Sequence, residues 1–132
     1  MNKNKPQPAP GPSQRMLRVG EMIRHAMAQM LTRGEIHDDD LSMRLISVPE
    51  VRMSPDLKIA TVFIMPLGGE DVDGAIAALD RNKRYIRGEI AHAVNLKYAP
   101  DIRFKKDVSF DEARRIDQLL ASDRVKRDAG KT

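Results

Sequence analysis

The sequence predicts an α+β fold in which helices pack on one face of a three-stranded sheet. Two runs of strand type flank a tight turn at residues 54–56, and apolar residues at helical spacing lie before and after them. A short alternating run at residues 102–105 adds the third strand. The predicted order is α-β-β-α-α-β-α, and 132 residues without a visible repeat fit one domain.

The first predicted helix covers residues 15–33. Its apolar positions recur at the helical period and lie on one side: Met16, Val19, Ile23, Ala26, Met27 and Met30. Ser13 is a suitable N-cap, and Gly34 can end the helix in the left-handed conformation. Arg15 and Arg18 fall on the opposite side, where they begin a basic stripe.

A hairpin supplies the first two strands. The first covers residues 45–53 and contains Pro49, which cannot donate to a ladder and so predicts a bulge or an edge position. Residues 54–56 are the Ser, Pro and Asp typical of a tight turn. The second strand, residues 57–65, has apolar residues on both faces and is therefore predicted to be central. The three aspartates at 38–40 are predicted to form a polar loop before the hairpin.

Two further helices are predicted over residues 72–81 and 84–97. Pro100 would stop the second one, because the residue before a proline disfavours the α region. The third strand alternates apolar and basic side chains: Ile102, Arg103, Phe104 and Lys105.

The final helix is predicted to begin at Ser109, which has capping-box spacing to Glu112. Its inner side would consist of Ala113, Ile116, Leu119 and Leu120. We expect a flexible Pro-rich segment at residues 1–12, a folded domain at 13–122 and a flexible charged tail at 123–132.

Composition excludes several classes of protein. No apolar run approaches the roughly 18 residues that a membrane span needs. The absence of Cys leaves no disulfide framework and no thiolate metal site, which is compatible with a reducing cytosol. His25, His37 and His92 have no partner at ligand spacing, so no metal is predicted. Asp38, Asp39 and Asp40 lack a paired base or nucleophile, so acid–base catalysis is not predicted either.

Charge is unevenly distributed along the chain. Residues 35–56 hold six acids and two bases, whereas residues 81–106 hold eight bases and two acids. Segregation of this kind favours a polyanionic partner for one face, with nucleic acid as the leading candidate. The alternative is a basic face that is merely solvated.

Five segments carry a family resemblance: Arg15-Met16-Leu17-Arg18-Val19, the hairpin from Val51 to Leu57, Ala60-Thr61-Val62-Phe63-Ile64, Tyr85-Ile86-Arg87, and Ala99-Pro100-Asp101-Ile102-Arg103-Phe104 with Asp107 following. Taken in their order and spacing, these segments resemble the ribosome-binding factor A family. The resemblance covers roughly residues 13–120.

This resemblance implies a KH-like domain of type II and a cytoplasmic protein without catalysis or cofactor. Its partner would be the immature 30S ribosomal subunit, bound through 16S rRNA, with maturation GTPases as further candidate partners. It would promote late maturation and 5'-end processing of the rRNA, would matter most in the cold, and is expected to be monomeric.

One junction departs from nucleic-acid-binding KH domains, which carry a Gly-x-x-Gly loop between their two middle helices. Here that junction reads Arg81-Asn82-Lys83-Arg84 and contains no glycine. The family instead has an alanine-centred kink between the helices, and Asn82 occupies the kink position. Asn tolerates left-handed geometry and can cap the next helix, so a kink is expected without a clamp on four nucleotides.

The candidate RNA-binding residues surround this junction: Arg81, Asn82, Lys83, Arg84 and Arg87. Backbone N–H groups and cationic side chains can meet a phosphate together there. Arg103, Lys105 and Lys106 would extend the site along the third strand. Arg15 and Arg18 either reach rRNA or pair with the acidic loop, and Tyr85 is the candidate for base stacking.

Two other function classes remain open. A protein-interaction module would use the acidic region at 35–56 and the apolar edge of the hairpin. An enzyme would need an apolar pocket with convergent ionisable groups.

Overall fold

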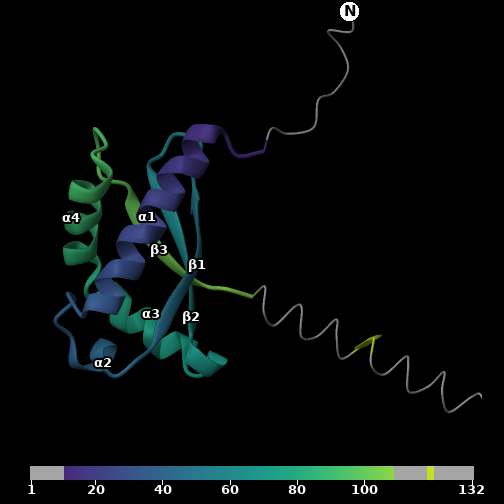
Figure 1. Cartoon of the computed structure of the whole chain (residues 1–132), viewed down its shortest axis with the longest axis vertical. Helices are drawn as coiled ribbons and strands as arrows, with labels where there is room; N and C mark the ends of the chain where they lie inside the picture. Colours follow the sequence, from purple (N-terminus) through teal and green to yellow (C-terminus); the bar gives the residue numbers. More distant parts are fainter. Residues whose placement is uncertain (1–10, 109–118, 121–132) are drawn as a thin grey trace, which may run out of the picture.

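The computed structural model describes residues 11–108 and 119–120. Its elements, in chain order, are α1 (Gln14–Arg33), α2 (Asp39–Ser42), β1 (Ile46–Met53), β2 (Ile59–Pro66), the 3₁₀ turn η1 (Leu67–Gly69), α3 (Val72–Arg81), α4 (Lys83–Val94) and β3 (Asp101–Lys106). The predicted α+β, KH-like fold is confirmed (Figure 1). The final predicted helix, apart from Leu119 and Leu120, lies outside the described residues, as do residues 1–10 and the whole predicted tail at 123–132.

The sheet has the order β1-β2-β3, so β2 is central as predicted. β1 pairs with β2 antiparallel, and β3 pairs with β2 parallel. Helices α1, α3 and α4 lie on one side of the sheet (Figure 1). Alternate residues of β2 are buried against them, for example Ala60, Val62 and Ile64. The core is one cluster between the helices and this face of the sheet.

Local sequence signals set the ends of α1. The Ser13 hydroxyl accepts a hydrogen bond from the Met16 N–H (3.1 Å), and the Met16 sulfur accepts one from the Ser13 N–H (3.4 Å). Gly34 ends the helix at φ 63°, as predicted. Gly20 allows close packing on the sheet, because a β-carbon there would lie 2.7 Å from the Val51 carbonyl oxygen of β1.

The hairpin follows the predicted turn with a longer loop. The Leu57 N–H donates to the Ser54 carbonyl (2.9 Å), and the Asp56 carboxylate accepts from the Ser54 hydroxyl and the Lys58 N–H. Leu57 adopts a left-handed φ of 61°, so β2 begins at Ile59, later than expected. The bulge predicted at Pro49 is present as a register shift between Ser47 and Glu50.

Three local predictions were wrong. α4 ends at Val94 because Asn95 adopts a left-handed conformation (φ 50°, ψ 46°), well before Pro100. The three aspartates do not form a plain loop, since the Asp38 carboxylate caps the short helix α2 by accepting from the Leu41 N–H (3.1 Å). Leu119 and Leu120 are exposed, whereas the prediction placed them on an inner side.

No described helix is long and apolar enough to cross a membrane.

Candidate nucleic-acid interface

Asn82 forms the junction between α3 and α4. Its backbone leaves the helical region at φ −104° and ψ 12°, and the chain changes direction there (Figure 1). The Asn82 N–H donates to the Leu79 carbonyl (3.0 Å), three residues back. The Ala78 carbonyl, which would accept that N–H in a continuous helix, instead accepts the Asn82 side-chain amide (2.8 Å). The side chain therefore replaces the helical hydrogen bond that the kink breaks.

The predicted kink at Asn82 is present, but its mechanism differs from the one expected. Asn82 is not left-handed, and its side chain does not cap α4. The side-chain amide points back to α3 and across to Asp38, whose carboxylate accepts from it at 2.9 Å. The first turn of α4 therefore has no side-chain cap for its N–H groups.

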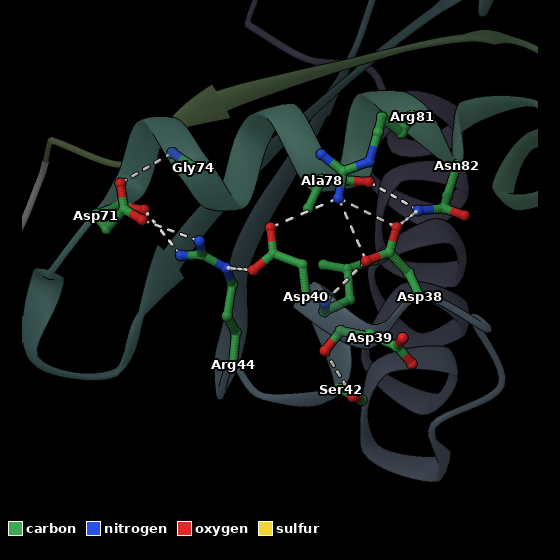
Figure 2. A network of polar contacts seen from close by, with 11 residues as sticks. Asp38, Asp39, Asp40, Ser42, Arg44, Asp71, Gly74, Ala78, Arg81 and Asn82 are labelled. Carbon is green, nitrogen blue, oxygen red and sulfur yellow. Dashed lines mark hydrogen bonds and ion pairs between the residues drawn. The ribbon is translucent and has the colours of Figure 1, made fainter.

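Asp38 gathers donors from three sources (Figure 2). Its carboxylate accepts from the Leu41 N–H (3.1 Å), the Asn82 amide (2.9 Å) and the Arg81 guanidinium (3.2 Å). Its side chain is only 13% exposed. The hydrogen bond from Asn82, followed by that from Leu41 and the contact with Arg81, lowers the pKa of Asp38 below its ordinary value. The carboxylate is therefore charged at neutral pH.

The contacts continue from Asp38 along α2 and α3 (Figure 2). Arg81 also lies 3.5 Å from the Asp40 carboxylate, and Asp40 pairs with Arg44 at 2.9 Å. Arg44 in turn pairs with Asp71 (2.9 Å), the N-cap of α3, and this contact is the main cause of the lowered pKa of Asp71. We call this set of contacts the acidic network; its members are Asp38, Asp40, Arg44, Asp71, Arg81 and Asn82.

Much of the charge in the acidic region is neutralised within the chain. Besides Asp38 and Asp40, Glu35 lies 3.8 Å from Arg33, and Glu50 pairs with Arg52 at 2.8 Å. Asp39 is exposed and has no ion pair or side-chain hydrogen bond among the described residues. The region therefore offers a partner protein less free negative charge than its composition indicates.

The basic residues of the junction divide into bound and unbound side chains. Arg81 is held by the acidic network, and Arg87 donates to the Ala99 carbonyl (3.0 Å) that precedes the buried Pro100. Lys83 lies 3.5 Å from Asp80 and is half-buried. Arg84 is exposed and has no ion pair or hydrogen bond within the described part of the chain. Beside it, Tyr85 is 44% exposed.

The remaining candidates lie on other surfaces. Arg103 is opposite Thr61 and Lys105 is opposite Phe63, so both point away from the face that the helices cover. Arg103 lies 3.7 Å from Asp101. Lys106, exposed, ends β3. Arg15 and Arg18 are exposed in the first turns of α1. This end of α1 lies far from the α3–α4 junction (Figure 1). The candidates therefore do not form one continuous patch.

Sequence reasoning missed a cation on the open face of the sheet. Arg52 lies over the Phe63 ring, 5.1 Å from its centroid, and is opposite Thr61 in the ladder. The signal was available, because Arg52 and Phe63 each take the outward place in their strands' alternation. Phe63 is half-buried on this face.

A groove of about 660 Å³ lies where β1 begins and β2 ends, against the last turn of α1. Its lining includes Leu31, Leu45, Pro66 and Leu67, and Arg44 is its one ionisable residue. Arg44 is already paired with Asp40 and Asp71, so this groove offers no convergent ionisable groups. Among the described residues, no three His, Asp or Glu side chains are grouped so as to hold a metal ion.

Comparison with known proteins identifies the family. The family model for ribosome-binding factor A matches residues 15–120. Ribosome-binding factor A of Afipia carboxidovorans is 61% identical over 91% of this chain and 85% of its own length. The Methylobacterium nodulans protein is 58% identical over 96% and 93% respectively.

Solved structures share the fold. Ribosome-binding factor A of Thermus thermophilus aligns with a TM-score of 0.59 at 24% identity, over 69% of this chain and 94% of that one. A Thermotoga maritima protein solved by NMR aligns with a TM-score of 0.57 at 26% identity, over 75% and 92% respectively. The chain belongs to the ribosome-binding factor A family.

Proposed function

We propose that this chain is a non-catalytic assembly factor that binds the free or immature 30S subunit through 16S rRNA. It promotes late maturation and 5'-end processing of that rRNA, with its greatest importance in the cold. Family membership supports the ribosomal target. A Thermus thermophilus ribosome-binding factor A of similar fold (TM-score 0.54) has been fitted into the map of a complex with the 30S subunit.

The observation that carries the proposed site is the contrast between Arg84 and its basic neighbours. Arg81 and Arg87 contact acceptors of this same chain, whereas Arg84 is exposed and its side chain has no partner among the described residues. Arg84 lies in the first turn of α4, where no side chain caps the N–H groups. A phosphate placed there would meet a guanidinium, the Lys83 ammonium and the positive end of a helix together.

The other candidates take secondary roles in this proposal. Asn82, Arg81 and Arg87 shape the junction, while Lys83 and Arg84 make the phosphate contacts. Arg103 and Lys105 face away from the helices and Arg15 and Arg18 lie in the first turns of α1, so these residues, together with Lys106 at the end of β3, meet rRNA segments other than the one bound by Arg84. The protein is cytoplasmic and monomeric, and maturation GTPases are further partners.

The test is sedimentation of the purified protein with 30S subunits, 50S subunits and assembled ribosomes. We expect selective co-sedimentation with free 30S subunits, which Lys83→Glu/Arg84→Glu abolishes. The matched control, Lys58→Glu/Lys97→Glu, reverses the same number of charges in the hairpin loop and beyond the C-terminal end of α4, and should retain binding. Equal loss in both variants would reduce the interaction to net charge, and equal binding to all particles would contradict a specific assembly factor.

Protein binding through the acidic region is the competing hypothesis. It predicts that charge reversal at residues 38–40 abolishes partner binding while reversal at Lys83 and Arg84 does not. The internal pairing of Asp38 and Asp40 disfavours it.

A further inference from the structure

We propose that Asp38 is a positioning residue of the RNA site: it fixes the start of α4 through Asn82 and holds Arg81, so that Arg84 is the arginine of the junction left for phosphate. This inference rests on the proposed function, since it assigns a role within the same site. It also assigns a structural role to the acidic segment, because Asp38 holds Arg81 and Asn82, which lie 43 and 44 positions later in the chain.

Asn82 is held by both of its amide hydrogens. One is donated to the Ala78 carbonyl (2.8 Å) and the other to the Asp38 carboxylate (2.9 Å). Both partners are acceptors, so the nitrogen of the amide must face them. The main-chain carbonyl of Asn82 accepts the Ile86 N–H (3.0 Å), and this is the first hydrogen bond of α4. The orientation of Asn82 therefore determines where α4 begins.

Asp38 is itself firmly anchored. It caps α2 through the Leu41 N–H, and the Leu41 side chain is buried in the core at 5% exposure. A carboxylate fixed in this way to the core can hold a junction in place, whereas one on a solvated loop could not. Loss of the hydrogen bond between Asp38 and Asn82 would leave an amide hydrogen of the half-buried Asn82 without an acceptor.

Asp38 also keeps the Arg81 side chain engaged within the protein. The Arg81 guanidinium lies on Asp38 and Asp40, at 3.2 and 3.5 Å. Arg84 follows three positions later, on the other side of the kink, and its side chain has no such partner among the described residues. Arg81 therefore has a structural role, whereas the Arg84 side chain can bind a phosphate.

Removal of the Asp38 charge should affect RNA affinity in opposite directions, depending on whether Asp38 acts only through its charge or by positioning the site. A carboxylate near a phosphate site repels the ligand, so its neutralisation should tighten binding if charge alone mattered. If Asp38 positions the site, Asp38→Asn should weaken binding to 30S subunits by about three- to tenfold, the equivalent of one or two net hydrogen bonds. Asp39→Asn is the matched control, because Asp39 is an exposed neighbour with the same charge. That variant should bind as well as the wild type or more tightly.

Asn82→Leu, which keeps the approximate size of the side chain, provides a second variant that leaves Asp38 and its cap of α2 in place. It removes both amide hydrogen bonds and should show the same loss of affinity as Asp38→Asn. The two changes combined should cost less than the sum of the single losses, because they break one shared contact. The salt dependence of binding should also become shallower, which a smaller folded fraction alone would not produce.

Hydrogen exchange of the Ile86 amide gives a readout that needs no RNA. It should accelerate in Asp38→Asn and stay unchanged in Asp39→Asn. If Arg84→Glu leaves 30S binding intact, the proposed site fails and the RNA role of Asp38 fails with it. If Arg84→Glu impairs binding but Asp38→Asn binds as tightly as the wild type, or if Ile86 exchange is unchanged, only the inference about Asp38 is overturned.

Discussion

Gly20 of α1 lies so close to Val51 of β1 that a β-carbon at position 20 would approach the Val51 carbonyl oxygen to 2.7 Å. The obstacle is backbone, which cannot swing aside as a flexible side chain would. Helix α1 therefore packs on the sheet at a distance that only glycine permits, and the position of the whole basic helix depends on this contact.

Gly20→Ala should destabilise the fold. The gain in helix propensity, up to about 1 kcal/mol, is outweighed by displacement of α1 from β1, and overpacking of this kind costs about 1–3 kcal/mol. Urea unfolding should show a lower midpoint at an unchanged slope. A midpoint equal to or above that of the wild type would contradict the close contact.

Gly88→Ala is the matched comparison on α4. A β-carbon at Gly88 would meet nothing within 4 Å, and the residue is exposed in the middle of the helix. The same substitution should therefore stabilise the protein by about 0.5–1 kcal/mol, since it removes only the backbone freedom of glycine. Urea unfolding of both variants under the same conditions should give shifts of opposite sign.

Asn95 supplies the left-handed residue that ends α4, at φ 50°. Replacement by Ala keeps the side chain small but places an unfavourable residue in that conformation, at a cost of about 1–2 kcal/mol. Asn95→Gly should be neutral or stabilising, because glycine adopts the conformation readily. Thermal unfolding checks the order Gly, Asn, Ala, and an Ala variant as stable as the Gly variant would refute it.

The parts of this fold that could be predicted from sequence are those fixed by local chemistry. Ser13, Gly34 and Pro49 act through neighbours a few residues away, and each has the predicted effect. The end of α4 was mispredicted because Asn95, a weaker signal than Pro100, acts first along the chain. Both residues carry local information, but the prediction used only Pro100.

The candidate site was less predictable because its decisive contacts are long-range. The pairing of Arg81 and Asn82 with Asp38 joins residues 43 and 44 positions apart, and no periodicity reports such a contact. Composition identified the basic segment but could not distinguish Arg81 and Arg87, which have partners, from Arg84, whose side chain has none among the described residues. That distinction required the tertiary fold.

Arg84→Ala should weaken 30S binding and reduce its salt dependence together. Each phosphate contact that is lost removes about one unit from the slope of log affinity against log salt concentration. Lys97→Ala removes an exposed cation beyond the other end of α4 and should leave the slope unchanged. Binding titrations at several salt concentrations measure both, and equal slopes for wild type and Arg84→Ala would argue against a phosphate contact by Arg84.

Acid should weaken the fold partly through the acidic network. The pKa of Asp38 and that of Asp71 lie below the ordinary value of 3.8, mainly because Asn82 and Arg44 respectively hydrogen-bond their charged forms. A carboxyl group whose pKa is lower in the folded state stabilises the fold fully above its unfolded pKa, and loses that contribution as pH falls through the folded value. Stability should therefore decline below about pH 4. In Asp38→Asn the decline should be shallower, because one of the groups no longer titrates. Urea unfolding between pH 7 and pH 3 measures this, and parallel curves for wild type and variant would show that Asp38 does not contribute.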